Sequence, residues 1–114
     1  MTAWPPRYDP TWRPRADAEH WAPDVECAPP SRRDAIILEK LRAQIAYAWE
    51  RSAFYRRHWQ AAGVSPATLR SPDDLPRFPV VRKEDLRAAQ AASPPFGDYL
   101  CIEPSEVARI HGTS

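Results

Sequence analysis

The sequence predicts a mostly α-helical chain of the α+β class, with short strands near its C-terminal end. Apolar residues recur at three- and four-residue steps between Ile37 and Ser52, which indicates a long amphipathic helix. Proline contributes 14 of 114 residues, well above the roughly 5% of average proteins, so much of the remaining chain must be extended or turned. Alternating apolar and polar residues from Val107 to His111 form the best candidate strand.

Residues 1–30 are expected to form an extended arm. Seven prolines lie among Trp4, Trp12 and Trp21, and proline at this density prevents a sustained helix or a central strand. A disordered leader is the alternative. Because three large aromatic side chains are costly to leave in water, we favour an arm that lies along a folded surface.

A long helix is predicted directly after the arm. Ser31 followed by Asp34 resembles a capping box, with the acid in place of the usual Glu. The predicted buried stripe contains Ile37, Leu38, Leu41, Ile45, Ala48, Trp49 and Ser52. Tyr47 departs from this stripe and is expected to face a second surface. Neither glycine nor proline interrupts the run before Gly63, so helix can continue through Trp59, with a break near Ser52 and Ala53 left open.

Shorter elements are expected beyond Gly63. Pro66–Leu69 and Ser71–Leu75 are typical of short helical turns, with Ser71 as a cap. An extended stretch at 77–81 then leads to a second amphipathic helix from Lys83 to about Ala92, with Leu86 and either Ala89 or Gln90 turned inward. The paired acids Asp73-Asp74 and Glu84-Asp85 lie near helix starts, where carboxylates interact favourably with the helix dipole.

Composition argues against several classes of partner. The formal charge is +1, which gives no strong field for nucleic acid or an anionic membrane. No segment approaches the ~20 apolar residues that span a bilayer. Cys27 and Cys101 match no metal-ligand spacing, so we interpret them as free thiols. We also expect a cytoplasmic protein.

No complete catalytic or metal site is evident in the chain. His20, His58 and His111 are too scattered for a metal site by spacing. The run Arg51 to Trp59 interleaves basic and aromatic residues and superficially resembles a nucleic-acid surface. At helical spacing, however, its aromatic side chains separate from Arg56 and Arg57, which favours packed aromatics and solvated or paired arginines.

Three segments in fixed order resemble the N-terminal end of the phenylacetate–CoA ligase family, among the AMP-forming, acyl-adenylating enzymes. The first runs from Leu38 to Trp59 and contains Phe54-Tyr55-Arg56-Arg57. The second runs from Ser71 to Pro79 and continues into Lys83-Glu84-Asp85-Leu86-Arg87. The third is Val107-Ala108-Arg109-Ile110-His111 followed by Gly112-Thr113-Ser114. The resemblance covers residues 21–114.

The resemblance implies where a nucleotide site would begin. In the family, the third segment runs into a Ser-Gly-Thr-Thr-Gly loop that holds the phosphates of ATP, so Thr113 and Ser114 would be cofactor-binding residues at its start. Catalytic residues would lie beyond Ser114, and no metal ligand is expected before it. Residues 31–114 would then form a helical N-terminal subdomain of the large α/β domain, ending where the phosphate loop begins.

The chain also departs from the family pattern. Relatives have an Asn-Ser-Pro type of break where this chain has Arg51-Ser52-Ala53, which leaves the interruption of the first helix open. They also have threonine near the positions of Val81 and Arg82, so the expected cap of the second helix is lost.

The resemblance further implies an activity for a parent enzyme. That enzyme would join an aryl carboxylic acid to ATP as an acyl-adenylate and pass the acyl group to CoA, with ATP, Mg²⁺ and CoA as cofactors. The 114-residue chain alone would be inactive and would bind none of them. Its partners would be the remainder of the ligase chain or, as a homodimer, a second copy, because its apolar stripe should be only partly covered.

Two alternatives remain open at this stage. One is a stand-alone helical module that binds a partner protein without catalysis. The other, weaker, is nucleic-acid binding through the region of Arg56 and Arg57.

Overall fold

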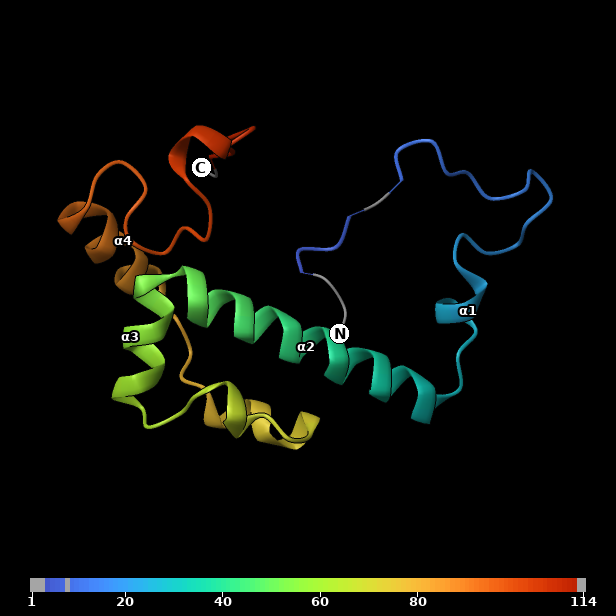
Figure 1. The fold of residues 1–114 in the computed structure, drawn as a ribbon, viewed down its shortest axis with the longest axis horizontal. Coiled ribbons are helices and arrows are strands. Elements are labelled where there is room, and N and C mark those ends of the chain that lie inside the picture. The colour runs from blue at the N-terminus through green and yellow to red at the C-terminus, as the bar shows by residue number, and fades with distance from the viewer. Residues whose placement is uncertain (1–3, 8, 113–114) are drawn as a thin grey trace.

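A computed structural model describes residues 4–7 and 9–112 of the chain. Its helices, in chain order, are α1 (Pro23–Glu26), α2 (Pro30–Arg51), α3 (Ala53–Ala61), the 3₁₀ helices η1 (Pro66–Thr68) and η2 (Pro72–Arg77), α4 (Lys83–Ala92) and the 3₁₀ helix η3 (Pro104–Glu106) (Figure 1). The prediction of a mostly helical chain is therefore confirmed. The short strands of the predicted α+β class were wrong, because none is present among the described residues.

The alternating segment from Val107 to His111 shows why that strand prediction failed. Its backbone follows η3 without regular structure, and only Val107 is half-buried while the other four residues are exposed. A strand depends on ladder hydrogen bonds to a neighbour. No other described segment is extended beside it to supply them, so an alternating pattern alone does not make a strand here.

Helix α2 runs through the middle of the molecule, from α1 at one end to α3 at the other (Figure 1). It begins at Pro30, and its N-cap is Pro29, which lies two residues before the expected Ser31 and makes no side-chain cap bond. The capping box predicted from Ser31 and Asp34 is therefore wrong. Proline suits the first helical position because its missing N–H would have no partner there.

Ser52 breaks the first helical run, which answers the question left open by the sequence. Its backbone is extended, with φ −108° and ψ 115°. Its side chain is fully buried, and its hydroxyl oxygen accepts a 3.3 Å hydrogen bond from the Tyr55 N–H. A serine in this conformation satisfies an N–H group at the start of α3, so α3 starts in a new direction without a proline.

The core lies where α2, α3 and the following turns meet. Its buried residues are Ile45, Trp59, Val64 and Leu69. The indole of Trp59 stacks nearly parallel to that of Trp49, 6.4 Å between ring centroids, and meets the ring of Phe78 edge-on at 5.5 Å. Such offset and edge contacts add to the burial of area. The packed aromatics predicted from helical spacing are thus confirmed.

One predicted member of the buried stripe lies outside the core. Ile37 is 43% exposed, because the N-terminal half of α2 extends past the other helices toward α1 (Figure 1). Periodicity identifies the face of a helix, whereas burial also requires a neighbouring element along its whole length.

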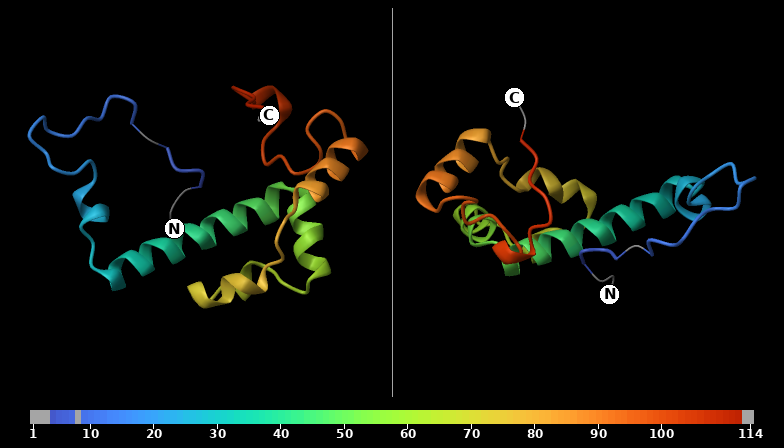
Figure 2. Two further views of the ribbon diagram at one scale, coloured as in Figure 1. Left: turned by 180° about the vertical axis from the view of Figure 1, so that it is seen from behind. Right: turned by 90° about the horizontal axis from the view of Figure 1, so that it is seen from above.

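The molecule is open rather than closed around a centre (Figure 2). Its radius of gyration is 17.3 Å, against about 13 Å for a compact domain of this length. Its accessible surface is 9193 Å², against roughly 6,300 Å² for a compact protein of this mass. The extended N-terminal loop contributes to this excess, and so do hollows along α2.

The described part of the arm follows a wide loop beside α2 (Figures 1 and 2). Trp12 and Trp21 pack edge-on against each other at 5.1 Å and stay 45% and 57% exposed. Trp4 lines the hollows along α2. The arm therefore borders the hollows along α2 through Trp4, whereas Trp12 and Trp21 pack against each other. The helical turn α1 was not predicted.

Candidate functional site

The residues predicted to begin a phosphate loop, Thr113 and Ser114, lie outside the described residues. The segment that leads to them is fixed to α2 by Tyr47, whose phenolic O–H donates to the Cys101 carbonyl oxygen at 3.2 Å. Tyr47 thus faces a second surface, as its departure from the buried stripe predicted. His111, next to the predicted loop, is exposed.

Asp98 fastens the same segment to the junction of α2 and α3. Its main-chain carbonyl accepts from the Phe54 N–H at 3.0 Å and from the Ser52 hydroxyl at 3.4 Å. Its carboxylate pairs with the Arg57 guanidinium at 2.8 Å. This hydrogen bond from Arg57 lowers the pKa of Asp98 below its usual value, so the pair is ionised at neutral pH.

Gly97 makes this arrangement possible. Its φ is +72°, and an added Cβ would lie 2.8 Å from a ring carbon of Tyr99 and 3.2 Å from the Ala89 carbonyl carbon. Both the positive φ and the close approach favour glycine. The Asp98 contacts escaped sequence analysis because their partners lie 41 and 46 positions away.

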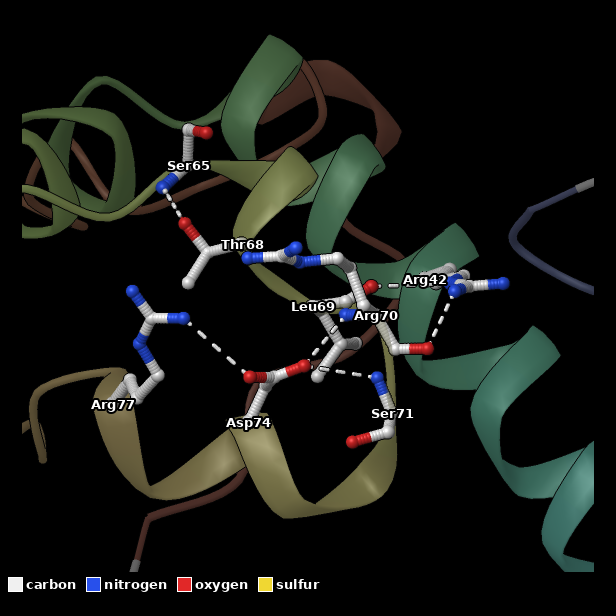
Figure 3. Close-up of polar contacts among 8 residues, drawn as sticks. All are labelled: Arg42, Ser65, Thr68, Leu69, Arg70, Ser71, Asp74 and Arg77. Atoms are coloured by element: carbon white, nitrogen blue, oxygen red, sulfur yellow. Dashed lines mark hydrogen bonds and ion pairs between the residues drawn. The ribbon is translucent and has the colours of Figure 1, made fainter.

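A second polar cluster joins α2 to η1 and η2 (Figure 3). Arg42 donates from Nε to the Leu69 carbonyl at 3.1 Å and from Nη2 to the Arg70 carbonyl at 2.7 Å. The Asp74 carboxylate accepts from the Ser71 and Arg70 N–H groups, both at 3.0 Å. The bond from the Ser71 N–H is the largest cause of the lowered pKa of Asp74. These groups bind main-chain atoms of this chain, so the cluster positions η1 and η2 on α2.

Paired acids near helix starts act partly as predicted. Asp74 and Asp85 each lie in a first helical turn, and the Asp85 carboxylate accepts from the Arg82 N–H at 2.7 Å. The capping threonine that relatives have near Val81 and Arg82 is absent from this chain. The Asp85 carboxylate nevertheless satisfies the Arg82 N–H that precedes α4. Inside α4, Ala89 is buried and Leu86 half-buried, whereas Gln90 is exposed.

The two arginines of α3 bond to other residues of this chain. Arg56 donates to the Trp49 and Glu50 carbonyls at 2.8 and 2.6 Å, which satisfies acceptors at the end of α2. Arg57 pairs with Asp98. The prediction that the arginines are solvated or paired is confirmed, and these contacts weaken the case for a nucleic-acid surface.

An apolar groove runs between α2 and the chain around η2. We call it the α2–η2 groove and define it by Leu41, Ile45, Trp59, Leu75, Phe78 and Val80. None of its described lining residues carries a charge. Leu75 and Val80 remain 42% and 76% exposed. Of the predicted apolar stripe, Ile45 is buried and Leu41 is half-buried, so the described residues cover that stripe in part.

The described residues offer neither a metal centre nor a membrane span. No group of three or more His, Cys, Asp or Glu side chains comes together among them, and none of their helices has the length and apolarity to cross a bilayer. Cys27 and Cys101 are free thiols, as predicted. Burial raises the pKa of the Cys101 thiol, which makes it a weak nucleophile.

The chain resembles named ligases in sequence. It is 39% identical over 94 residues to the phenylacetate–coenzyme A ligase of Thermus thermophilus, a match that covers 82% of this chain and 20% of that enzyme. It is 34% identical over 90 residues to the phenylacetate–coenzyme A ligase of Escherichia coli, covering 79% of this chain and 20% of that enzyme. No protein-family profile matches the chain.

Solved structures agree with these relatives. Residues covering 98% of the chain superpose on a 2-hydroxyisobutyryl-CoA ligase in complex with its acyl-AMP, with 48% sequence identity and a TM-score of 0.92. An open conformation of the same ligase with acyl-AMP and CoA gives a TM-score of 0.93. The chain spans about a quarter of the length of these structures and about a fifth of the curated relatives.

Proposed function

The chain belongs to the phenylacetate–CoA ligase-like family of adenylate-forming enzymes, and from that premise we propose that it forms the N-terminal part of an AMP-forming acyl-CoA ligase. The observation that carries the proposal is 48% identity across 98% of the chain at a TM-score of 0.92. A fold-level likeness without such identity would not support an activity.

Within that enzyme the described residues act as a scaffold. Tyr47 and Asp98 hold the chain on its way to Thr113 and Ser114, which we propose as the start of the ATP phosphate loop. The acid would be joined to ATP as an acyl-AMP with release of pyrophosphate, and the CoA thiol would then displace AMP, with Mg²⁺ supplying charge stabilisation at the phosphates. No group of three or more His, Cys, Asp or Glu side chains comes together among the described residues, and the groups that perform this chemistry are proposed to belong to other parts of the enzyme.

The acid is proposed to be an aryl carboxylic acid, following the phenylacetate ligases. A small hydroxy acid is a second candidate, because the 2-hydroxyisobutyryl-CoA ligase has higher identity, 48% against 39%. The use of ATP and CoA, together with two free thiols, fits a cytoplasmic enzyme.

The test begins with the natural reading frame beyond Ser114. We expect it to continue into a loop rich in glycine and threonine. The product of that frame should release pyrophosphate from ATP with either phenylacetate or 2-hydroxyisobutyrate, and the 114-residue chain alone should release none. A stop codon after Ser114 would instead favour a stand-alone helical interaction module, and pyrophosphate release by the 114-residue chain would contradict the division of labour proposed here.

A further inference from the structure

We propose that Trp4 is a positioning residue: it holds the Tyr47 side chain in place, and Tyr47 in turn fixes the segment that leads to the proposed ATP phosphate loop. This inference rests on the proposed function, because the loop at Thr113 and Ser114 belongs to it. The N-terminal arm would thus influence nucleotide binding through one tryptophan, from the opposite end of the chain.

Trp4 and Tyr47 share a place between two hollows along α2. One hollow is the α2–η2 groove. The other, which we call the α2–η1 hollow, has apolar lining residues that include Leu38, Ala43, Ala46, Pro66 and Leu69. Among the described residues, only Trp4 and Tyr47 line both hollows. Trp4 is half-buried there, whereas Trp12 and Trp21, which line neither hollow, stay 45% and 57% exposed.

The hydrogen bond of Tyr47 needs a well-held ring. Its O–H donates to the Cys101 carbonyl at 3.2 Å, longer than the usual 2.7–2.8 Å or so for such a bond. The Arg51 guanidinium lies over the ring, 5.9 Å from its centroid, which adds a cation–π contact. Cys101 also lines the α2–η2 groove together with Trp4. An indole at this place restricts the ring and limits the access of water to the bond, which strengthens it.

The Cys101 carbonyl is the point from which this effect reaches the loop. The described hydrogen bonds of residues 102–112 join residues of that segment to one another, as between Glu103 and Glu106. Cys101 is therefore the last described residue at which a hydrogen bond ties the segment to the helical body. A shift of Tyr47 moves this attachment and is passed along the segment toward Thr113.

The course of the arm is shared with a solved ligase. The superposition on the 2-hydroxyisobutyryl-CoA ligase covers 98% of this chain at a TM-score of 0.92, so too little of the chain is left out to contain the arm. Most of the arm therefore follows the same path in a second protein. This agreement indicates that the arm belongs to the fold, and Trp4 is its tryptophan that is placed to hold it beside α2.

The test uses the full product of the natural reading frame, with Trp4→Ala as the variant and Trp12→Ala as the matched control. Both substitutions remove an indole from the arm, but Trp12 lines neither hollow. The KM values for ATP and for CoA are measured with phenylacetate or 2-hydroxyisobutyrate, whichever acid the enzyme activates. The rate at which maleimide labels Cys101 is measured separately, by mass spectrometry of the peptide that contains it.

We expect Trp4→Ala to raise the KM for ATP by about three- to tenfold, with a change of less than about twofold in the KM for CoA. Labelling of Cys101 should become at least about threefold faster. Trp12→Ala should leave all three values unchanged, and Trp4→Phe, which keeps an aromatic ring, should restore most of the loss. Equal effects of Trp4→Ala and Trp12→Ala, or equal rises in the KM for ATP and for CoA, would overturn the proposal.

A double-mutant cycle tests whether Trp4 acts through Tyr47. Tyr47→Phe keeps the ring but removes the O–H that donates to Cys101, so it should itself raise the KM for ATP. In the Tyr47→Phe background, Trp4→Ala should add less than about twofold, because the bond that Trp4 protects is already absent. Effects of the two substitutions that simply multiply would show that Trp4 acts by another route and would also overturn the proposal.

The labelling of Cys101 separates this inference from the proposed function. If the full product released no pyrophosphate with either acid, the ligase role would fail, yet faster labelling in Trp4→Ala alone would still support the hold of Trp4 on the contact between Tyr47 and Cys101. Pyrophosphate release with equal labelling rates in Trp4→Ala and Trp12→Ala would support the ligase role and overturn the inference.

Discussion

The side-chain hydrogen bonds within the N-terminal arm, residues 4–29, have a shorter range along the sequence than those within the helical body, residues 30–101. In the described part of the arm, side-chain hydrogen bonds join residues no more than four positions apart, as between Arg15 and Asp17. In the helical body, Arg42, Tyr47 and Ser52 bond to carbonyls that lie 27, 54 and 46 positions away.

This difference follows from the sequence of each region. Proline removes backbone donors from the arm, so its side-chain hydrogen bonds stay local, although Trp12 and Trp21 pack against each other from positions further apart. The body has aromatic and aliphatic residues at helical spacing, and its long-range contacts close loops that the unfolded chain leaves open. We therefore expect the body to unfold as one cooperative unit, to which the arm contributes little.

The largest expected effect comes from the aromatic core. Trp59→Ala removes a buried indole that contacts Trp49, Tyr55 and Phe78, and should lower the free energy of unfolding by about 3–5 kcal/mol. Trp12→Ala in the arm should lower it by less than about 0.5 kcal/mol. Urea unfolding followed by far-UV circular dichroism measures both. Similar losses for the two variants would show that the arm is part of the cooperative unit.

The break between α2 and α3 should give the next effect. Ser52→Ala removes the cap of α3 and leaves the carbonyl of the half-buried Asp98 with one donor fewer, so we expect a loss of about 1–2 kcal/mol in the free energy of unfolding. Ser31→Ala serves as the control, because Ser31 is exposed and makes no cap for α2. The same urea titration applies, and an unchanged Ser52→Ala midpoint would contradict the role assigned to this hydroxyl.

The cluster around η1 should contribute somewhat less. Arg42→Ala removes two hydrogen bonds to the Leu69 and Arg70 carbonyls. Because the Arg42 side chain is partly solvated, we expect a loss near the lower end of the range for charged hydrogen bonds, about 1 kcal/mol. Arg32→Ala, at an exposed position of the same helix, should change the free energy of unfolding by less than about 0.5 kcal/mol. A thermal melt of each variant checks the ranking.

The smallest expected effect depends on pH. Arg57 holds the pKa of Asp98 below its usual value of 3.8, so the ionised carboxylate favours folding. This contribution is complete above the unfolded pKa and disappears as the pH falls through the lower, folded pKa. Asp98→Asn should therefore make the urea midpoint less dependent on pH below about pH 4.

Asp17 provides the matching test in the arm. Its pKa is also lowered, by a hydrogen bond from Arg15. Because the two residues are two positions apart, the unfolded chain can form the same pair, so Asp17→Asn should leave the pH dependence of the urea midpoint unchanged. Equal flattening by Asp17→Asn and Asp98→Asn would remove the distinction between arm and body.

Local sequence signals predicted the helices well. The stripe containing Leu41 and Ile45 and the bounds of α4 at Lys83 and Ala92 appear in the structure, whereas the break at Ser52 was left open by the sequence. Each depends on residues within a few turns of one another, where spacing and capping chemistry determine the outcome. Motifs in the same segments indicated the family that the ligase comparisons support.

Features that depend on distant residues could not be predicted. Asp98 is an ordinary loop acid in the sequence, and its partners Ser52 and Arg57 become neighbours only after the chain beyond α4 folds back onto the junction of α2 and α3. The failed strand near Val107 and the exposed Ile37 have the same cause, since each needed a neighbouring element that is not beside it. The nucleotide-binding role of Thr113 and Ser114 stays a prediction.

Gly97 has a consequence for how this region tolerates change. A side chain at that position would meet the Tyr99 ring and the last turns of α4, and the displaced backbone would carry the Asp98 carbonyl away from Phe54. Mutational scanning should thus find an intolerant position in the loop that follows α4. Its sensitivity would reflect the geometry of a chain reversal, and reading it as a sign of ligand contact would be a mistake.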